Sequence, residues 1–331
     1  DIDAMVTAGQ HISLGGNVDA DAAISAGQNI SVVGDLDMDA ALTAGQDVSV
    51  TGNLLDTAGT GTITAEGDVV INGNVTDFDG AVAANDLVID GTADFDSTVT
   101  ATGALTIGGD TTIDGAVQAE DVSIDGTATF ANTVQAADVD ITGNTVFQNT
   151  LTANDVIIGG TAQFDGVVTT ADVTVTGTTD LNAALTGQDL NFVGDFDNAA
   201  GATVTGSDIT FDAATTLAAG IIGSGDVNFT QTGGTQAIAN TVSGNSVSIA
   251  QGANIDAAVT ALQDISIVGD ADADAALTAG ATVTGSDITF DAATTLAASI
   301  TGSGDVNFTQ TGGTQAIANT VSGNSVSIAQ G

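Results

Sequence analysis

Short stretches that alternate apolar and polar residues recur along the whole sequence. Triplets such as Val48-Ser49-Val50 and Val122-Ser123-Ile124 place a polar residue between two apolar ones. A period of two residues is typical of a β-strand with one buried face. Glycine follows almost every triplet, as Gly52 and Gly126 do, where a tight corner needs permissive backbone angles. The pattern predicts many short strands joined by short corners.

These triplets are spaced too closely for any repeat larger than one turn of a solenoid. If each repeat is anchored on the residue before its triplet, every interval from Ala104 to Asp189 is 17 residues; most earlier intervals are 18, and later ones run from 18 to 23. Helical repeats need about 33 residues or more and propeller blades about 40. The sequence therefore predicts an all-β fold, a single-chain β-solenoid, without specifying the handedness of its coils. It has about 18 coils, typically of 17–18 residues, in one continuous array over residues 1–331.

Large apolar residues recur at fixed offsets from the anchors, which predicts ladders in a continuous core. One series lies nine residues after successive anchors and comprises Phe95, Ile113, Phe130, Phe147, Phe164 and Leu181. A second series lies three residues after its anchors and comprises Phe192, Phe211, Phe229, Phe290 and Phe308. We interpret both as core ladders and not as the lining of a ligand pocket.

A longer duplication is superimposed on the short repeat. Residues 201–252 recur as 280–331 and differ only at Gly220 against Ser299 and at Ile222 against Thr301. The second copy stops where the first continues into further repeats, which predicts continuation by a longer array or by another subunit. We expect end-to-end self-association into fibres, because the flat face of a terminal coil is buried only against another coil.

The charge of the chain excludes several classes of partner. The 331 residues include 42 acids, no lysine or arginine and one histidine, for a net charge of −42, although 43% of residues are apolar. Such a chain cannot neutralise the phosphates of nucleic acid, and it is repelled by anionic membrane surfaces. No apolar run approaches the roughly 18 residues that span a bilayer.

The absence of cysteine and the start of the chain predict where the protein resides. Without cysteine there are no disulfides and no thiolate chemistry, which is compatible with an extracellular protein stabilised by repetition. The chain begins at Asp1 without the features of a signal peptide. We expect a mature or internal portion of a protein at the cell surface or outside the cell.

Catalytic chemistry is poorly represented in this sequence. His11 is the single imidazole, and it occupies an anchor position held elsewhere by Asn29 and Asp47, so we interpret it as a surface corner residue. There is no phosphate-binding or dinucleotide motif, and zinc is not expected with one histidine and no cysteine. The sequence predicts no enzyme.

Acidic columns near the N-terminus are the candidate cation sites. Alternation predicts that Leu36, Met38 and Ala40 point inward while the aspartates between them point outward. Two carboxylates about 4.8 Å apart repel by roughly 1 kcal/mol in water, and no lysine is present to separate them. Ca²⁺, which prefers oxygen ligands, is one candidate cation, and diffuse screening by mobile cations is the alternative. The candidate ligands are Asp1, Asp3, Asp19, Asp21, Asp35, Asp37, Asp39, Asp270, Asp272 and Asp274.

The phrases AGQNISVVG (26–34), AGQDVSVTG (44–52) and AEGDVVING (65–73) resemble the short repeats of bacterial filamentous-haemagglutinin-like and autotransporter-type adhesins. The resemblance is one of repeat style and extends over the whole chain. It implies a right-handed β-helix, a location at the cell surface and a role in adhesion. Those proteins carry lysine, arginine and an N-terminal secretion domain, which this sequence lacks.

Taken together, these patterns predict a non-enzymatic extracellular structural protein, a rod-like subunit of a surface fibre, sheath or filament. Short corners leave no inserted loop for receptor recognition, and near-identical copies indicate length gained by duplication. The alternative is the stalk or passenger of a bacterial surface adhesin.

Overall fold

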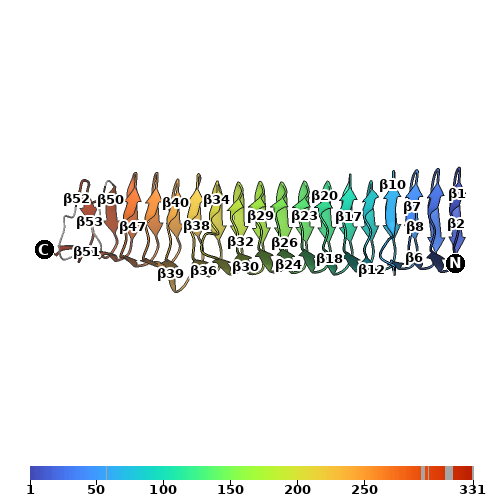
Figure 1. Cartoon of the computed structure of the whole chain (residues 1–331). Helices are drawn as coiled ribbons and strands as arrows, with labels where there is room; N and C mark the ends of the chain where they lie inside the picture. The colour runs from blue at the N-terminus through green and yellow to red at the C-terminus, as the bar shows by residue number, and fades with distance from the viewer. Residues whose placement is uncertain (57, 292–294, 297, 310–315, 330–331) are drawn as a thin grey trace. The chain divides into compact units, whose positions relative to one another are not determined.

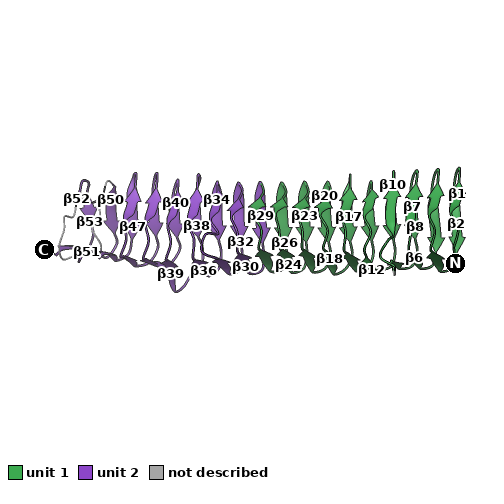
Figure 2. Cartoon of the chain, in the orientation of Figure 1, with its two compact units in different colours: residues 1–170 green, residues 171–331 purple. Residues whose placement is uncertain are grey.

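The computed structural model consists of parallel β-strands stacked as a β-solenoid of about 17 turns, which confirms the predicted fold class. It describes residues 1–56, 58–291, 295–296, 298–309 and 316–329. Among these residues no helix exists that could cross a membrane. The chain divides into two compact units, residues 1–170 and 171–331 (Figure 2). Continuity of the array over residues 1–331 stays a prediction.

Each turn of unit 1 consists of three short strands, one on each face of the solenoid (Figure 1). Face A contains β1 (Val6–Ala8), β4 (Ile24–Ala26), β7 (Ala41–Ala44), β10 (Thr62–Ala65), β13 (Val82–Ala84), β16 (Val99–Ala101), β19 (Val117–Gln118), β22 (Val134–Gln135), β25 (Leu151–Thr152) and β28 (Val168–Thr169). Face B contains β2 (Ile12–Gly15), β5 (Ile30–Val33), β8 (Val48–Val50), β11 (Val69–Ile71), β14 (Leu87–Ile89), β17 (Ala104–Ile107), β20 (Asp121–Ile124), β23 (Asp138–Ile141) and β26 (Asp155–Ile158). Face C contains β3 (Val18–Ala20), β6 (Leu36–Met38), β9 (Leu54–Leu55), β12 (Val75–Phe78), β15 (Ala93–Phe95), β18 (Thr111–Ile113), β21 (Ala128–Phe130), β24 (Thr145–Phe147) and β27 (Ala162–Phe164).

Unit 2 is built in the same way, and its strands take the same face letters, with face D as a fourth sheet. Face A contains β31 (Leu185–Thr186), β34 (Val204–Gly206), β37 (Ile221–Gly223), β40 (Val242–Gly244), β43 (Val259–Ala261) and β46 (Leu277–Ala279). Face B contains β29 (Asp172–Val175), β32 (Asp189–Phe192), β35 (Asp208–Phe211), β38 (Val227–Phe229), β41 (Val247–Ile249), β44 (Ile265–Ile267), β47 (Thr282–Gly285), β50 (Ser299–Gly302) and β53 (Val321–Ser322). Face C contains β30 (Thr179–Leu181), β33 (Phe196–Asn198) and β36 (Thr215–Leu217). Face D contains β39 (Thr235–Ile238), β42 (Gly252–Ile255), β45 (Ala271–Ala273), β48 (Ile288–Phe290), β51 (Asp305–Phe308) and β54 (Ser325–Ile328), and β49 (Thr295–Leu296) pairs with β52 (Ala316–Ile317).

Hydrogen bonds between successive turns hold the stack together. In β2 and β5, Ile12 lies opposite Ile30, one turn later, and the Ile12 amide donates to the Asn29 carbonyl over 3.0 Å. Side chains alternate inward and outward along each strand, so every face contributes apolar residues to one core. Corners stack as tightly as strands: a Cβ at Gly80 would lie 1.2 Å from the Gly61 carbonyl oxygen, so Gly80 accepts no side chain without a shift of the backbone.

The first predicted ladder is confirmed on face C of unit 1. Phe95, Ile113 and Phe130 are register partners on successive turns. The ring centroids of Phe130 and Phe147 lie 5.0 Å apart at an interplanar angle of 7°, and those of Phe147 and Phe164 lie 5.6 Å apart at 4°. Full burial of a phenylalanine contributes about 1.5–3 kcal/mol, so this column is a main source of stability in unit 1.

In unit 2 a buried asparagine replaces the apolar residue of the face C column. Asn198 lies opposite Leu181 and is fully buried. Its Nδ2 donates to the Ala202 carbonyl over 2.9 Å, and its Oδ1 accepts from the Ala218 amide over 2.9 Å. These bonds fix the longer corner at 199–203, which the following turn covers.

The expectation of short corners throughout is wrong in unit 2. Residues 199–203 separate β33 from β34, and residues 230–234 separate β38 from β39. In the second corner Gly233 and Gly234 have φ angles of +95° and +104°, a conformation that favours glycine. The segment before β39 projects from the stack in Figure 1.

The two copies of the long duplication lie on different faces. In the first copy, Val204–Gly206 (β34) is on face A and Asp208–Phe211 (β35) is on face B. In the second, Thr282–Gly285 (β47) is on face B and Ile288–Phe290 (β48) is on face D. The second copy is therefore displaced by one face around the solenoid.

This displacement corrects the predicted alignment of the later repeats. The anchors Asp264 and Asp287, 23 residues apart, imply that Ser266 lies opposite Thr289. Ser266 instead lies opposite Thr284, and Thr289 lies opposite Asp272. The length of a turn thus stays at 17 or 18 residues here.

The second predicted ladder is consequently divided between two faces. Phe192, Phe211 and Phe229 stack on face B, with centroid distances of 5.4 and 5.2 Å. Phe290 and Phe308 stack on face D at 5.0 Å. All five are buried, which confirms the prediction that they are core residues. The prediction that they form a single column is wrong.

Candidate functional site

Among the described residues, four groups of aspartates bring carboxylate oxygens together on the surface. In each group, three carboxylates offer oxygens that all lie within 4.8 Å of one another. The groups are Asp1, Asp3 and Asp21; Asp19, Asp21 and Asp39; Asp77, Asp79 and Asp96; and Asp272, Asp274 and Asp291.

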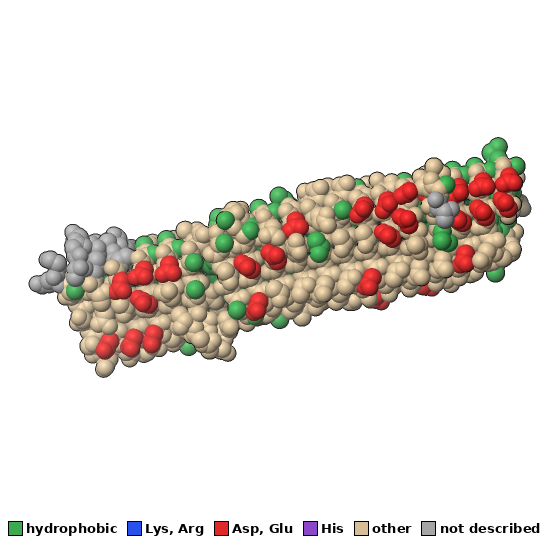
Figure 3. Space-filling model, turned by 60° about the horizontal axis from the view of Figure 1, so that its bottom comes forward, with side chains coloured by type: hydrophobic (Ala, Val, Ile, Leu, Met, Phe, Trp, Pro, Cys, Tyr) green, Lys and Arg blue, Asp and Glu red, His purple; other side chains and the backbone are tan. Residues whose placement is uncertain are grey.

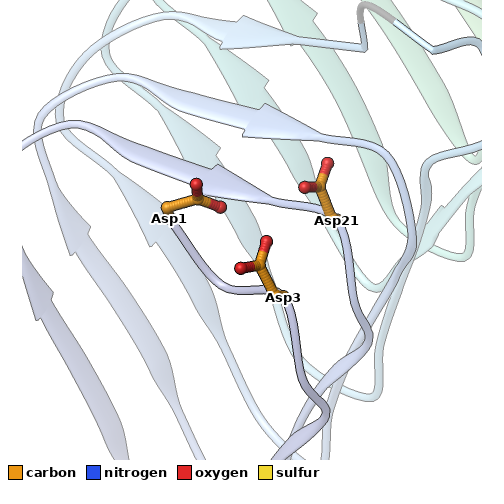
Figure 4. A group of neighbouring side chains, drawn as sticks. All are labelled: Asp1, Asp3 and Asp21. Atoms are coloured by element: carbon orange, nitrogen blue, oxygen red, sulfur yellow. The ribbon is translucent and has the colours of Figure 1, made fainter.

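The first group forms where the N-terminal residues pair with the next turn. The Ile2 amide donates to the Asp19 carbonyl over 2.7 Å, and the Ala22 amide donates to the Ile2 carbonyl over 3.1 Å. The carboxylates of Asp1 and Asp3 therefore flank Ile2 beside Asp21, as Figure 4 shows. The negative charge of Asp19 raises the pKa of Asp21, with further contributions from partial desolvation and from neighbouring carboxylates. Protons or cations are thus attracted to this cluster.

Seven of the ten predicted ligands belong to these groups, and three lie elsewhere. Asp35 caps a corner: its Oδ1 accepts from the Asn53 amide over 2.8 Å and its Oδ2 accepts from the Asn17 side chain over 3.0 Å. Asp270 likewise accepts from the Asp287 amide over 3.2 Å. Asp37 lies in register with Asp19 on the outer side of β6 and is outside the four groups.

The inward and outward assignments around these aspartates are confirmed in part. Leu36 and Met38 are buried, as predicted. Ala40 is only partly buried, so its predicted inward position is confirmed only in part. The strand β6 ends at Met38, and alternation does not extend beyond the end of a strand.

The group at Asp77, Asp79 and Asp96 is absent from the ligands predicted from sequence. Between β12 and β15, Val75 pairs with Ala93 and Phe78 with Phe95, so β12 contains one extra residue. This β-bulge places Asp77 at φ +52°, a left-handed conformation that aspartate tolerates better than most residues. The signal in the sequence is the pair of Asp-Phe-Asp motifs at 77–79 and 94–96.

The bulge produces the most perturbed carboxyl group of the described residues. A hydrogen bond with Asp79 raises the pKa of Asp96 to about 6, with partial desolvation and the charges of Asp79, Asp77 and Asp94 contributing in the same direction. The bulge thus favours protonation of Asp96, or binding of a cation beside it.

Asp291 is also absent from the predicted ligands, because its position depends on the displacement of the second copy. Its counterpart in the first copy, Asp212, accepts a hydrogen bond from Thr230 and belongs to none of the four groups. Partial burial raises the pKa of Asp272, and the charges of Asp291 and Asp274 raise it further. No sequence pattern distinguishes the two copies at this position.

The clusters offer oxygen ligands only, which suits a hard cation such as Ca²⁺. They are largely exposed, and three carboxylates leave several of the 6–8 ligand positions of Ca²⁺ to water. Occupancy by Ca²⁺ stays a prediction. His11 is an exposed corner residue, as predicted: its Nδ1 accepts from the Asn29 amide over 3.4 Å, much as the Asn29 side chain accepts from the Asp47 amide.

Comparison with known proteins gives a partial family match. Residues 54–152 match the model of a family described as bactofilin, polymer-forming cytoskeletal. This segment of unit 1 is similar to bactofilins. It covers 99 of 331 residues (152 − 54 + 1) and includes the bulge at Asp77 and the ladder residues from Phe95 to Phe147.

No curated protein and no solved structure gives a significant match. The matched family is described as structural and polymer-forming, which agrees with the class of function predicted from the sequence. Nothing in the comparisons supports the resemblance to filamentous-haemagglutinin-like or autotransporter proteins in particular, or the adhesin alternative.

Proposed function

We propose that this protein is a non-enzymatic structural protein that polymerises by stacking one solenoid on the next. The observation that carries the proposal is the stack itself. Each internal turn pairs its peptide groups with the next turn and buries apolar side chains, as Val247 and Ile249 are buried where β41 pairs with β44.

The bactofilin-like segment supports the same function, because that family is described as polymer-forming. Stacking is also the mode of association that is least opposed by repulsion between the carboxylates of two copies. Turn-on-turn contact uses main-chain hydrogen bonds and apolar side chains, whereas most outer surfaces of the solenoid carry carboxylates. A head-to-tail contact that does not close generates a filament.

Two observations indicate different locations for the filament. The family description includes a cytoskeletal role, which implies the inside of the cell. The absence of cysteine is compatible with a location outside the cell. Fractionation of the source cells, followed by immunodetection with and without protease treatment of intact cells, decides between them.

The test of polymerisation is a charge placed on β54, the last strand that the structure describes, at a position that points inward in the equivalent strand β41. Val326→Asp puts a carboxylate where a further turn would bury it, so we expect filaments to be lost or strongly shortened in negative-stain images. Ser327→Asp is the matched control, because Ser327 alternates outward with Asn307. Equal filament lengths in the two variants would contradict stacking through this strand.

A further inference from the structure

Face A is the face of the solenoid whose two central outward columns carry no charge, and Glu66, directly after β10, lies at its margin. In unit 1 its strands β1 to β28 expose one column at their centre and another just before each strand. The central column reads Thr7, Ser25, Thr43, Thr64, Ala83, Thr100, Gln118, Gln135, Thr152 and Thr169. The column before it reads Met5, Ala23, Ala41, Thr62, Ala81, Thr98, Ala116, Thr133, Thr150 and Val167. In unit 2 the central column of β31 to β46 is likewise uncharged, and it reads Thr186, Thr205, Ile222, Ser243, Thr260 and Thr278.

The other faces differ from face A in charge. Several strands of face B begin with an exposed aspartate, as β20, β23 and β26 do at Asp121, Asp138 and Asp155. The outward column of face C includes Asp19 and Asp94. Figure 3 shows carboxylates gathered in rows on one side of the molecule. In a chain with 42 acids and no lysine or arginine, this segregation leaves one face on which a like-charged surface can approach.

Face A also exposes apolar side chains. Met5, Val167 and Ile222 lie in its outward columns and are 72%, 47% and 48% exposed, and Leu262, directly after β43, is 74% exposed. These four are among ten large apolar residues that are exposed in the described part of the chain. Their burial would favour a contact at face A, and small Ala, Ser and Thr neighbours permit close approach of two sheets.

We propose that face A is the surface on which a second copy of this chain docks, face against face, so that filaments pair laterally. The inference rests on the proposed function, because it concerns solenoids that have already polymerised. A second copy has no cation to place against the carboxylates of faces B or C, and each pair of carboxylates about 5 Å apart costs roughly 1 kcal/mol even in water. Contact between two A faces avoids this repulsion and uses the same patch on both partners.

The size of the face explains why pairing needs the polymer. Ten strands at about 4.8 Å spacing and three residues of width cover roughly 450 Å² on each partner of unit 1, or about 900 Å² in total. Specific interfaces usually bury about 1,200–2,000 Å². Unit 1 alone thus falls short of a stable contact, whereas many units in line bind with the combined strength of repeated contacts.

The experiment compares filament width in the native chain and in two double variants, in chelator at moderate ionic strength so that divalent cations do not bridge carboxylates. Thr100→Asp with Gln135→Asp places charges on face A. Thr106→Asp with Ser123→Asp places the same number of charges on the outward column of face B in the same unit. We expect native filaments two solenoids wide, face A variants one solenoid wide and face B variants two wide, all of similar length by electron microscopy.

The outcomes separate this inference from the proposed function. Native filaments of single width, or equal loss of pairing in both double variants, would overturn docking through face A while leaving polymerisation intact. Single-width native filaments that co-sediment with insoluble cellulose would assign the face to a polysaccharide instead. Absence of filaments from the native chain would overturn the proposed function, and the pairing with it.

Discussion

Residues 201–252 and 280–331 differ at only two positions, yet they occupy different faces of the solenoid. The first copy follows β33 on face C, so its first strand, β34, lies on face A. The second copy follows β46 on face A, so its first strand, β47, lies on face B. The same sequence therefore folds into the same strands, and the preceding turn decides which face they join.

The three faces are interchangeable because each makes the same demand on the sequence. An inward residue at every second position satisfies any face, and a parallel neighbour one turn away satisfies the peptide groups. Displacement by one face thus preserves burial, as Phe211 on face B and Phe290 on face D show. What changes is the set of lateral neighbours, and the predictions below test those neighbours.

The largest expected effect is a cross-link that forms in one register and not in the other. With no native cysteine, the variant Asp272→Cys with Thr289→Cys should form a disulfide, because these residues are paired across face D and neighbouring parallel strands satisfy the Cα separation of a disulfide. Ser266→Cys with Thr289→Cys, the pair implied by the repeat spacing, should remain reduced. Mass spectrometry after mild oxidation measures both, and the reverse result would show that the second copy keeps the face of the first.

The next effect is on core stability at one phenylalanine in each copy. Phe211 stacks between Phe192 and Phe229, whereas Phe290 has Phe308 on one side and Ala273 on the other. Phe→Ala in a core costs about 3–5 kcal/mol, and each aromatic pair adds about 0.5–1.5 kcal/mol. Phe211→Ala should therefore lower the free energy of unfolding more than Phe290→Ala, as measured by denaturant titration. Equal losses of unfolding free energy in the two variants would contradict the inference that Phe211 and Phe290 have different stacking neighbours.

Asn198 tests the corner that leads into the first copy. Asn198→Ala removes a hydrogen bond from the Ala202 carbonyl and another from the Ala218 amide, in a buried corner. Each buried group left unpaired costs about 1–3 kcal/mol, so we expect a loss of about 2–4 kcal/mol in thermal or denaturant unfolding. Asn191→Ala, on the outer side of β32, is the control and should be nearly neutral. The second copy has no counterpart of Asn198, so its hydrogen-exchange protection should change less.

A smaller effect separates Asp291 from its counterpart Asp212. Asp291→Asn removes one of three clustered carboxylates and should raise the melting temperature in chelator at low ionic strength, by the equivalent of about 1 kcal/mol. Both substitutions weaken an equivalent bond, from Thr309 to Asp291 and from Thr230 to Asp212, but Asp212→Asn relieves no such cluster, so no gain is expected for it. If Ca²⁺ binds the native clusters, it stabilises the folded chain by mass action. Sodium should then restore only part of the melting temperature that is lost in chelator. Full restoration by sodium would show that diffuse screening, and not an ordered Ca²⁺ site, stabilises the clusters.

The smallest effect is the pH dependence contributed by Asp96 in unit 1, outside both copies. Its folded pKa of about 6 lies above that of an unfolded aspartate, about 3.9, so the folded state binds more protons between these values. Its contribution to stability therefore falls as pH rises from about 4 to about 6 and stays low above that range. Asp96→Asn should flatten this part of the melting-temperature profile, while Asp114→Asn should leave it unchanged. Identical profiles for native protein and Asp96→Asn would contradict the coupling with Asp79.

Local pattern was sufficient to predict much of the fold. Alternation identified the inward residues of most strands, and the 17-residue interval by itself placed Phe130, Phe147 and Phe164 in one column. The same reasoning was less accurate at Ala40, which lies beyond the end of β6 and is only partly buried. It failed between Asp264 and Asp287, where the longer interval reflects a change of face and not a longer turn.

The candidate cation clusters were predictable only where aspartates repeat in a regular stack. Asp1, Asp3, Asp19, Asp21 and Asp39 follow the 18-residue spacing, and the structure brings them together. The group around Asp96 depends on a bulge at Asp77. A bulge changes register within one strand, and the spacing of the motifs does not specify which residue is extra.

The amino-acid pattern alone specifies a β-solenoid with a continuous apolar core and an acidic surface. Those properties depend on period two, on turn length and on composition, which are local and additive along the chain. The tertiary structure alone decides which face each strand joins. It therefore also decides that Asp291 lies near Asp272 and that the central columns of face A carry no charge. The reason is that each turn takes its register from the turn before it. The face on which a segment lies therefore depends on the lengths of all preceding corners, so two identical segments can lie on different faces.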